Sequence, residues 1–165
     1  IVDSYFGKSS CYFVGSFVGY GHSYSNIENC YSNATTVGKY YCCGIAGETK
    51  GTVSNCLYNG KIKSTRNSNA IATDYKSYGK LTNCYYNENC GLSSSRATAV
   101  TDKQLASGEV TYLLNGSQNN IIWYQNVDKG EKDNAPTLNS EHYRVYKGDN
   151  IYTNDLDKHL SLIHI

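Results

Sequence analysis

The sequence is poor in charge and in helix-forming residues, and each shortage excludes a class of protein. Only 18% of the residues are charged and the formal net charge is +1, so no concentrated basic region offers a site for nucleic acid or an anionic membrane surface. No run of about 18 apolar residues, the length that spans a bilayer, is present. The heptads of a long coiled coil are also missing. We therefore expect no nucleic-acid partner and no membrane-spanning segment.

Met is absent and Pro occurs once, whereas 17 Tyr, 15 Gly and 7 Cys stand out among the 165 residues. Tyr favours strands, while Gly, Asn and Ser favour turns. In the first hundred residues no stretch places apolar side chains at helical spacing over three turns. This composition predicts a mainly β chain.

Both ends of the sequence are unusual. It begins at Ile1, and neither an initiating Met nor a signal peptide is recognisable. Residues 160–165 resemble the translation of a transposon-type sequencing adaptor read in one frame. We interpret the chain as a fragment from environmental DNA whose native part ends near His159, with a short apolar strand as the alternative for the last six residues.

The first hundred residues repeat. One line-up aligns Ile1–Tyr5, Ile27–Tyr31, Val53–Leu57 and Leu81–Tyr85, at offsets of 26, 26 and 28 along the chain. A second aligns Phe17, Ile45 and Ile71, at offsets of 28 and 26. Each unit holds short β-prone runs separated by Gly, Asn and Ser, which tolerate the backbone of sharp corners. Two separate patterns that share one period indicate a true repeat.

The length of the period predicts the fold class. It is too short for a four-stranded propeller blade, which takes about 40 residues, but suits one coil of a parallel β-solenoid. In such a coil each strand pairs with its equivalent one coil away. We expect a right-handed parallel β-helix or β-solenoid of about four coils over residues 1–97, followed by a small α+β C-terminal cap.

Equivalent residues of successive coils stack, so the repeat predicts rows of side chains. The three rows are Asp3, Asn29, Asn55 and Asn83; Ser4, Cys30, Cys56 and Cys84; and Tyr5, Tyr31, Leu57 and Tyr85. Stacked amides hydrogen-bond along the stack, and we interpret the Asn row as structural rather than as a ligand track. The tyrosines either pack a core or corner, or face outwards and grip a sugar. Tyr5, Tyr31 and Tyr85 are therefore candidate ligand-facing residues.

All seven cysteines lie at or before residue 90, and three share one repeat position. This regular use is typical of small buried hydrophobic side chains. The closely spaced pairs of a zinc site are absent, so we expect no metal site. Cys84 and Cys90 could close a small disulfide in an oxidising medium, but the odd total leaves at least one thiol free and the pairing open.

The composition changes after residue 97. Residues 1–97 hold nine Lys+Arg and five Asp+Glu, whereas residues 98–165 hold six and nine. Thr101-Asp102-Lys103-Gln104 predicts a capping box, and Asn115-Gly116 predicts a helix end, with Gly108 splitting the helix in two. We expect a helix–strand capping segment over residues 98–139, with a strand-like run at Ile121–Tyr124. Residues 140–159 form a strand pair or the start of a truncated next domain.

Two residue groups of this second segment have alternative interpretations. Trp123 stands beside two isoleucines, so it is either a core residue or a glycan platform and joins the candidate ligand-facing residues. Asp128, Glu131 and Asp133 could bind Ca²⁺ weakly, but the lysines between them favour a solvated turn.

No motif brings catalytic residues together. The Gly-x-Ser-x-Gly elbow, the His-Glu-x-x-His helix and the phosphate-binding Gly-Lys-Ser/Thr loop are all missing. The acidic residues of the repeats are spread out and do not recur as a pair on one face. We expect a protein that is not an enzyme, with no catalytic, cofactor-binding or metal-binding residues.

Residues 43–62 resemble the GLUG repeat of bacterial cell-surface proteins. Gly44-Ile45-Ala46-Gly47 matches its first block, and Gly51-Thr52-Val53-Ser54-Asn55-Cys56 matches its second. Residues 15–31 match less closely, and residues 69–87 have Ala70 and Thr73 where the pattern has glycines. The resemblance covers roughly residues 1–90.

The resemblance implies a non-catalytic structural or adhesive module of a secreted or surface-anchored, adhesin-like protein. Its expected partners are host glycans, host surface proteins and further repeats of a longer chain. Two alternatives remain: an accessory targeting or spacer region of a secreted peptidase or glycosidase, and a carbohydrate-binding module.

Overall fold

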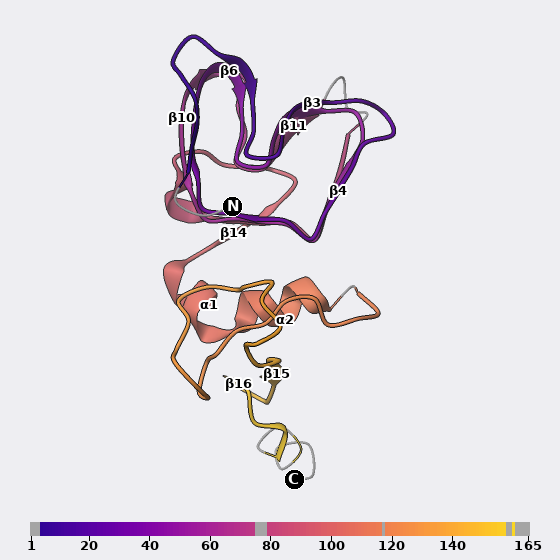
Figure 1. Ribbon diagram of the computed structural model, residues 1–165, viewed down its shortest axis with the longest axis vertical. Coiled ribbons are helices and arrows are strands. Elements are labelled where there is room, and N and C mark those ends of the chain that lie inside the picture. Colours follow the sequence, from indigo (N-terminus) through magenta and orange to yellow (C-terminus); the bar gives the residue numbers. More distant parts are fainter. Residues whose placement is uncertain (1–3, 75–78, 117, 158–159, 161–165) are drawn as a thin grey trace. The chain divides into compact units, whose positions relative to one another are not determined.

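The computed structural model describes residues 4–74, 79–116, 118–157 and 160. The chain divides into two compact units, residues 1–99 (the first unit) and 100–165 (the second unit), and each is described by itself (Figure 1). Asp3, at the head of the predicted Asn row, and residues 161–165 of the adaptor-like end lie outside the described residues.

The first unit consists of three passes of the chain through the same series of sheets. The first pass forms β1 (Tyr5–Gly7), β2 (Tyr12–Val14), β3 (Val18–Gly21), β4 (Asn26–Glu28) and β5 (Tyr31–Ser32). The second forms β6 (Thr35–Cys42), β7 (Ala46–Thr49), β8 (Thr52–Ser54) and β9 (Leu57–Tyr58). The third forms β10 (Lys61–Arg66), β11 (Ala72–Asp74), β12 (Lys80–Thr82) and β13 (Tyr85–Asn87), followed by the 3-10 turn Glu88–Cys90 and β14 (Thr98–Val100).

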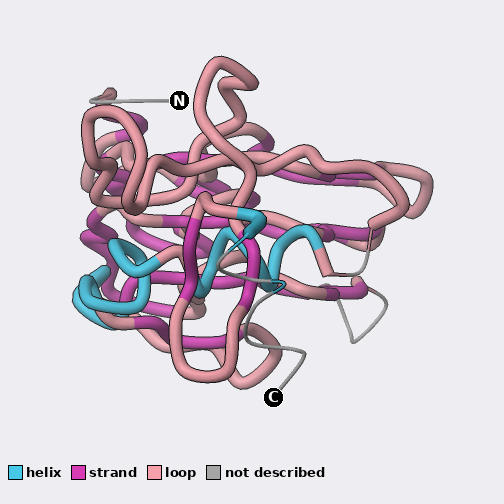
Figure 2. The backbone as a smooth tube through the Cα atoms, turned by 90° about the horizontal axis from the view of Figure 1, so that it is seen from below, coloured by secondary structure: helices cyan, strands magenta, loops and turns pink. Residues whose placement is uncertain are grey.

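Strands of successive passes lie side by side and run parallel (Figure 2). The strand orders are β1-β6-β10, with β2 also paired to β6; β11-β7-β3; β12-β8-β4; and β14-β13-β9-β5. Ile27 pairs with Val53, and Val53 pairs with Leu81. These pairings have the same offsets as the sequence repeat, so the predicted mainly β chain and its period are confirmed.

The predicted first members of the Tyr row and the Cys row, Tyr5 and Ser4, are wrong. Tyr31, Leu57 and Tyr85 share one register, but Tyr5 pairs with Thr35 in a different sheet. The Thr35 amide also donates to the Ser4 carbonyl oxygen (2.9 Å), which removes Ser4 from the cysteine row. The reason is chain length. Tyr12 pairs with Tyr40, and Tyr40 follows Tyr31 by nine residues, whereas Tyr12 follows Tyr5 by only seven. A segment two residues shorter cannot span the corner between the two sheets, so Tyr5 lies after that corner, beside Thr35.

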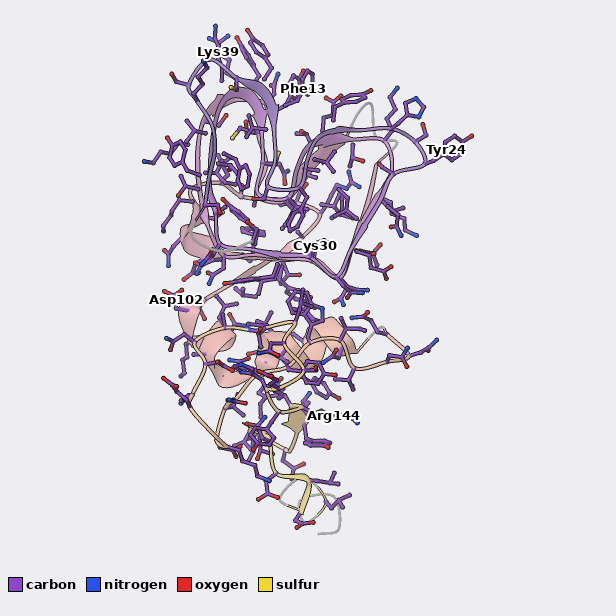
Figure 3. The ribbon with its side chains drawn as sticks, in the orientation of Figure 1. Phe13, Tyr24, Cys30, Lys39, Asp102 and Arg144 are labelled. Atoms are coloured by element: carbon purple, nitrogen blue, oxygen red, sulfur yellow. The ribbon has the colours of Figure 1, made fainter. Side chains whose placement is uncertain are left out.

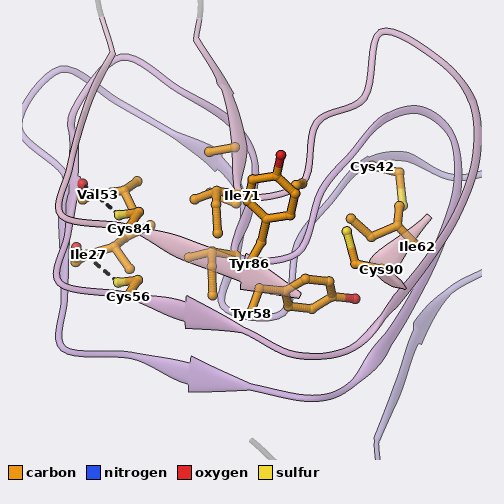
Figure 4. Packing of buried hydrophobic residues seen from close by; sticks show 14 of the residues in the cluster. Ile27, Cys42, Val53, Cys56, Tyr58, Ile62, Ile71, Cys84, Tyr86 and Cys90 are labelled. Carbon is orange, nitrogen blue, oxygen red and sulfur yellow. Dashed lines mark hydrogen bonds between the residues drawn. The ribbon is translucent and has the colours of Figure 1, made fainter. Parts of the chain in front are cut away.

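The core of the first unit lies inside the passes. Ile45, Val53, Leu57, Tyr58 and Ile71 are completely buried. Figure 4 shows Val53, Tyr58 and Ile71 packed among the other buried residues of the core cluster. A Cβ on Gly44 would lie 2.3 Å from Cγ of Tyr58, so only glycine leaves room for the tyrosine ring. The apolar positions of the repeat thus fill the space that the sheets enclose.

Asparagines form one corner of each pass. Asn29, Asn55 and Asn83 have positive φ angles of 51°, 51° and 49°, a conformation that asparagine adopts more readily than most residues. Nδ2 of Asn83 donates to Oδ1 of Asn55 (2.8 Å), while Nδ2 of Asn55 donates to Oε1 of Glu28 (3.4 Å). The predicted amide stacking is confirmed between the last two passes. A second such pair, Asn87 on Asn59 (2.7 Å), was not predicted.

The loop that follows the sheet β11-β7-β3 differs in length from pass to pass. Residues 22–25 join β3 to β4, residues 50–51 join β7 to β8, and residues 75–79 join β11 to β12. The strands after this corner nevertheless return to register, as the pairing of Asn26 with Thr52 and of Thr52 with Lys80 shows. The unequal offsets of the repeat therefore arise largely in this loop.

The second unit begins with two short helices, α1 (Asp102–Ser107) and α2 (Glu109–Asn115). The Thr101–Gln104 capping box is present, and Gly108 separates the helices with a φ of 90°, so both predictions are confirmed. β15 (Tyr146–Lys147) and β16 (Tyr152–Thr153) form an antiparallel pair within this same unit.

The predicted strand at Ile121–Tyr124 is wrong. Only Tyr124 forms a bridge, to Thr137. The reason is a side chain: Oδ1 of Asn115 accepts from the amides of Ile122 and Trp123 (both 3.0 Å), which takes these N–H groups out of any strand ladder.

Candidate binding surface

The exposed large hydrophobic side chains of the first unit gather in its first pass. We call this set the first-pass surface: Tyr5, Tyr12, Phe13, Phe17, Tyr20 and Tyr24. Their exposed fractions run from 37% for Phe13 to 95% for Tyr24. Among the described residues of this unit, the second and third passes have no exposed large hydrophobic side chain.

The position of the first pass in the sheets explains this exposure. In every sheet of the first unit, the first-pass strand stands at one end of the strand order. An edge strand presents N–H and C=O groups on its outer side to any strand that approaches. The large apolar side chains of the first pass are exposed because no pass lies on the outer side of these edge strands to cover them.

Two aromatic stacks link the first pass to the second. The rings of Tyr12 and Tyr40 are 5.0 Å apart at an interplanar angle of 18°, and those of Phe13 and Tyr41 are 4.9 Å apart at 7°. Tyr20 meets Phe13 edge to face, at 5.7 Å and 82°. Such pairs contribute about 0.5–1.5 kcal/mol beyond the area they bury. The surface is therefore an ordered aromatic array.

The backbone holds the second stack at a corner. Phe13 and Tyr41 have φ angles of 54° and 50°, and Asn67, the equivalent residue of the third pass, has 50°. A left-handed backbone is strained for bulky side chains, so the aromatic residues keep a conformation that Asn67 adopts at lower cost. Nζ of Lys39 lies 5.6 Å from the centre of the Tyr40 ring, which adds a positive charge at the bend of β6 (Figure 3).

The predicted ligand-facing residues do not form one exposed track. Tyr5 is exposed, Tyr31 is half-buried, and Tyr85 is buried. Trp123 is completely buried, and Nδ2 of Asn115 donates to its carbonyl oxygen (2.8 Å). Of the two interpretations of Trp123, the structure supports the core residue, and its ring offers no platform to a glycan.

Sequence reasoning missed Tyr12, Phe13 and their partners. A signal was present, because Tyr12-Phe13 is separated from Tyr40-Tyr41 by the same offset that separates Phe17 from Ile45. This third line-up would have identified the aromatic stacks. It would not have shown that their first-pass members are exposed, since exposure depends on what covers the first pass.

Two of the three acidic side chains considered for calcium, those of Asp128 and Asp133, stabilise loops of the second unit, while Glu131 is exposed. The Asp128 carboxylate accepts from Oγ1 of Thr153 (2.6 Å) and from the Asn154 amide (2.8 Å). Oδ2 of Asp133 accepts from the Asn126 amide (2.7 Å) and lies 2.6 Å from Nδ1 of His142. Within the ranges that the structure describes, no group of three or more His, Cys, Asp or Glu side chains is placed to hold a metal ion.

Among the described residues, the candidate functional site is the first-pass surface. Among them, no helix is long and apolar enough to cross a membrane. No protein-family model, curated protein or solved structure matches the chain.

Proposed function

We propose that the chain is a non-catalytic structural module, a parallel β-solenoid of a secreted or surface-anchored bacterial protein. Its first-pass surface receives a further coil of the same repeat. Support comes from the three passes, whose parallel register has the offsets of the sequence repeat, and from the GLUG-like pattern of residues 43–62. A solenoid coil contacts mainly its two neighbours, so coils of one pattern stack into long arrays.

One observation carries this proposal: the edge strands and the exposed hydrophobic side chains of the first unit lie on the same pass. A further coil would pair with β1, β3, β4 and β5 as the second pass does now. An aromatic residue in that coil would extend the Tyr12–Tyr40 stack by one ring. The exposed face thus has the chemistry of the buried interface between the first two passes.

Adding a coil tests the proposal. We expect that a copy of residues 35–60 placed directly before Tyr5 raises the Tm by about 5–10 °C, because it covers apolar surface without changing the existing passes. That junction reproduces the natural one between Gly60 and Lys61, since Lys61 and Tyr5 both pair with Thr35. Thermal unfolding followed by circular dichroism gives the Tm.

The matched control carries the same added residues in scrambled order. The proposal requires that the control leaves the Tm unchanged and Tyr12 exposed. An equal Tm for both extended chains, or a lower Tm for the ordered copy, would contradict stacking of a further coil.

The same surface favours one other function, a carbohydrate-binding module. Aromatic rings offer an apolar face to a sugar, while a Lys ammonium donates hydrogen bonds to its hydroxyls. Tyr12 and Tyr20 provide exposed rings, and Lys39 provides the ammonium over the Tyr40 ring that stacks on Tyr12. Host glycans would then be the partner. A targeting role within a secreted peptidase or glycosidase would use this same binding.

Soluble polysaccharides test this second function. We expect binding to change tyrosine fluorescence but not that of the buried Trp123, and Tyr12→Ala to weaken affinity at least tenfold by removing an exposed ring. Tyr143→Ala, which removes an exposed tyrosine of the second unit, is the matched control. If neither wild type nor control binds any polysaccharide in the panel, the surface serves coil stacking alone.

A further inference from the structure

Three cysteines, Cys30, Cys56 and Cys84, directly precede the neighbouring parallel strands β5, β9 and β13. The Leu57 amide donates to the Cys30 carbonyl oxygen (3.0 Å), and the Tyr85 amide donates to that of Cys56 (2.9 Å). These bonds place Cys30, Cys56 and Cys84 in one register across the three passes. Neighbouring strands are about 4.8 Å apart, within the Cα separations of about 4.4–6.8 Å at which disulfides form.

The three thiols also have the same orientation. Each donates to the carbonyl oxygen two residues earlier: Cys30 to Glu28 (3.3 Å), Cys56 to Ser54 (3.0 Å) and Cys84 to Thr82 (3.4 Å). Figure 4 shows the Cys56 and Cys84 side chains pointing the same way from successive strands. The middle sulfur, that of Cys56, therefore has a sulfur neighbour on either side.

The environment of the row distinguishes its members. Cys56 and Cys84 are buried, whereas Cys30 is partly exposed, so a soluble reagent reaches Cys30 first. Interaction with the Cys56 side chain lowers the pKa of Cys30 to about 7, although burial acts in the opposite direction. The accessible thiol of the row is thus also substantially ionised near neutral pH, and the thiolate is the form that attacks disulfides.

We propose that Cys30 and Cys56 form a disulfide that joins the first and second passes when the chain meets a small-molecule disulfide such as oxidised glutathione. The Cys30 thiolate attacks one glutathione sulfur and releases one glutathione thiolate, which leaves a mixed disulfide. The Cys56 thiol then loses its proton, its thiolate attacks the sulfur of Cys30, and the second glutathione leaves as a thiolate that takes up that proton. Two cysteines are oxidised, one glutathione disulfide is reduced to two thiols, and Cys84 remains a thiol.

This inference does not depend on the proposed function, because it rests on the register, orientation and exposure of the three cysteines. It also differs from the Cys84–Cys90 pairing considered from the sequence. Figure 4 shows those two residues at opposite sides of the core cluster, with Cys90 beside Cys42 and Ile62. Neither can reach the other without repacking that cluster.

Peptide mapping after oxidation tests the assignment. The experiment uses the full chain with Cys11→Ser, which removes the other partly exposed thiol. After incubation with oxidised glutathione, alkylation and trypsin, we expect residues 9–39 to be joined to residues 51–61. Each of these peptides then holds one cysteine. The rate of oxidation should rise with pH and reach half its maximum near pH 7, where half of Cys30 is ionised.

Thermal unfolding supplies a second readout. Closing the loop between the two passes should raise the Tm by about 5–10 °C over the reduced chain. Cys84→Ser should keep both the linked peptides and the Tm increase, while Cys56→Ser should leave Cys30 carrying glutathione without that increase. Three results would overturn the proposal: residues 51–61 joined to residues 81–96, Cys30 found only as a glutathione adduct in the Cys11→Ser chain, or all thiols still free.

Discussion

Val53→Asp abolishes the cooperative unfolding of the first unit. Val53 is completely buried in β8, the middle strand of the order β12-β8-β4, with Ile27 and Leu81 as its partners. An aspartate there is either a buried carboxylate without a counter-charge or a protonated acid without hydrogen-bond partners, and each costs several kcal/mol. That cost is comparable with the whole stability of a domain, about 5–15 kcal/mol. Ile45→Asp should have the same effect.

Circular dichroism against temperature and against urea measures this loss. Thr82→Asp is the control, because it also replaces a β-branched residue with aspartate in the same sheet, but at an exposed position. We expect the control to unfold cooperatively with a stability within about 1 kcal/mol of wild type. If Val53→Asp melted like the wild type, Val53 would lie outside the core and the register described above would be incorrect.

Tyr58→Ala destabilises the first unit by about 3–5 kcal/mol. The Tyr58 ring is completely buried, so its loss leaves a cavity that the sheets around it cannot close. Its hydroxyl lies within hydrogen-bond distance of the carbonyl oxygens of Ala34 (2.7 Å) and Lys61 (2.9 Å), which link the start of two passes. Removing the ring also leaves the buried carbonyl oxygen of Ala34 and the partly buried one of Lys61 without this donor, which adds to the cost.

Tyr58→Phe separates the two contributions, because it keeps the ring and removes only the hydroxyl. We expect it to cost about 1–2 kcal/mol in urea unfolding. Tyr24→Ala, at the most exposed tyrosine, should change stability by no more than about 0.5 kcal/mol. Equal losses for the Ala and Phe variants at position 58 would mean that the ring contributes little and that the hydroxyl alone matters.

The period and the corners were readable from the sequence because they depend on local chemistry. Apolar residues at Ile27, Val53 and Leu81 fix one register, and asparagines mark the positions that require a left-handed backbone. The capping box of α1 was readable for the same reason, since four consecutive residues contain all its groups.

The remaining features depend on chain length and on distant contacts. The residues around Tyr5 resemble those around Tyr31, but the number of residues between Tyr5 and Tyr12 places Tyr5 in another sheet. Ile121–Tyr124 has the composition of a strand, yet Asn115 binds its amides from α2. The exposure of Tyr12 and the burial of Trp123 both depend on which part of the chain covers them, and a local pattern does not contain that information.

The corner loops 22–25, 50–51 and 75–79 have a consequence for how the protein can change. Each has a different length, yet the strands on either side stay in register. Residues 22–24 of the first of these loops are exposed, so substitutions there leave the sheets unchanged, as is common for surface loops. Gly51 of the second loop is buried, and a Cβ there would lie 2.0 Å from the Ser25 carbonyl oxygen, so this position requires glycine. Insertions in the exposed loop 22–25 would therefore vary the outer surface while the sheets beneath it stayed constant. The same corner is a natural place to graft foreign peptides for display.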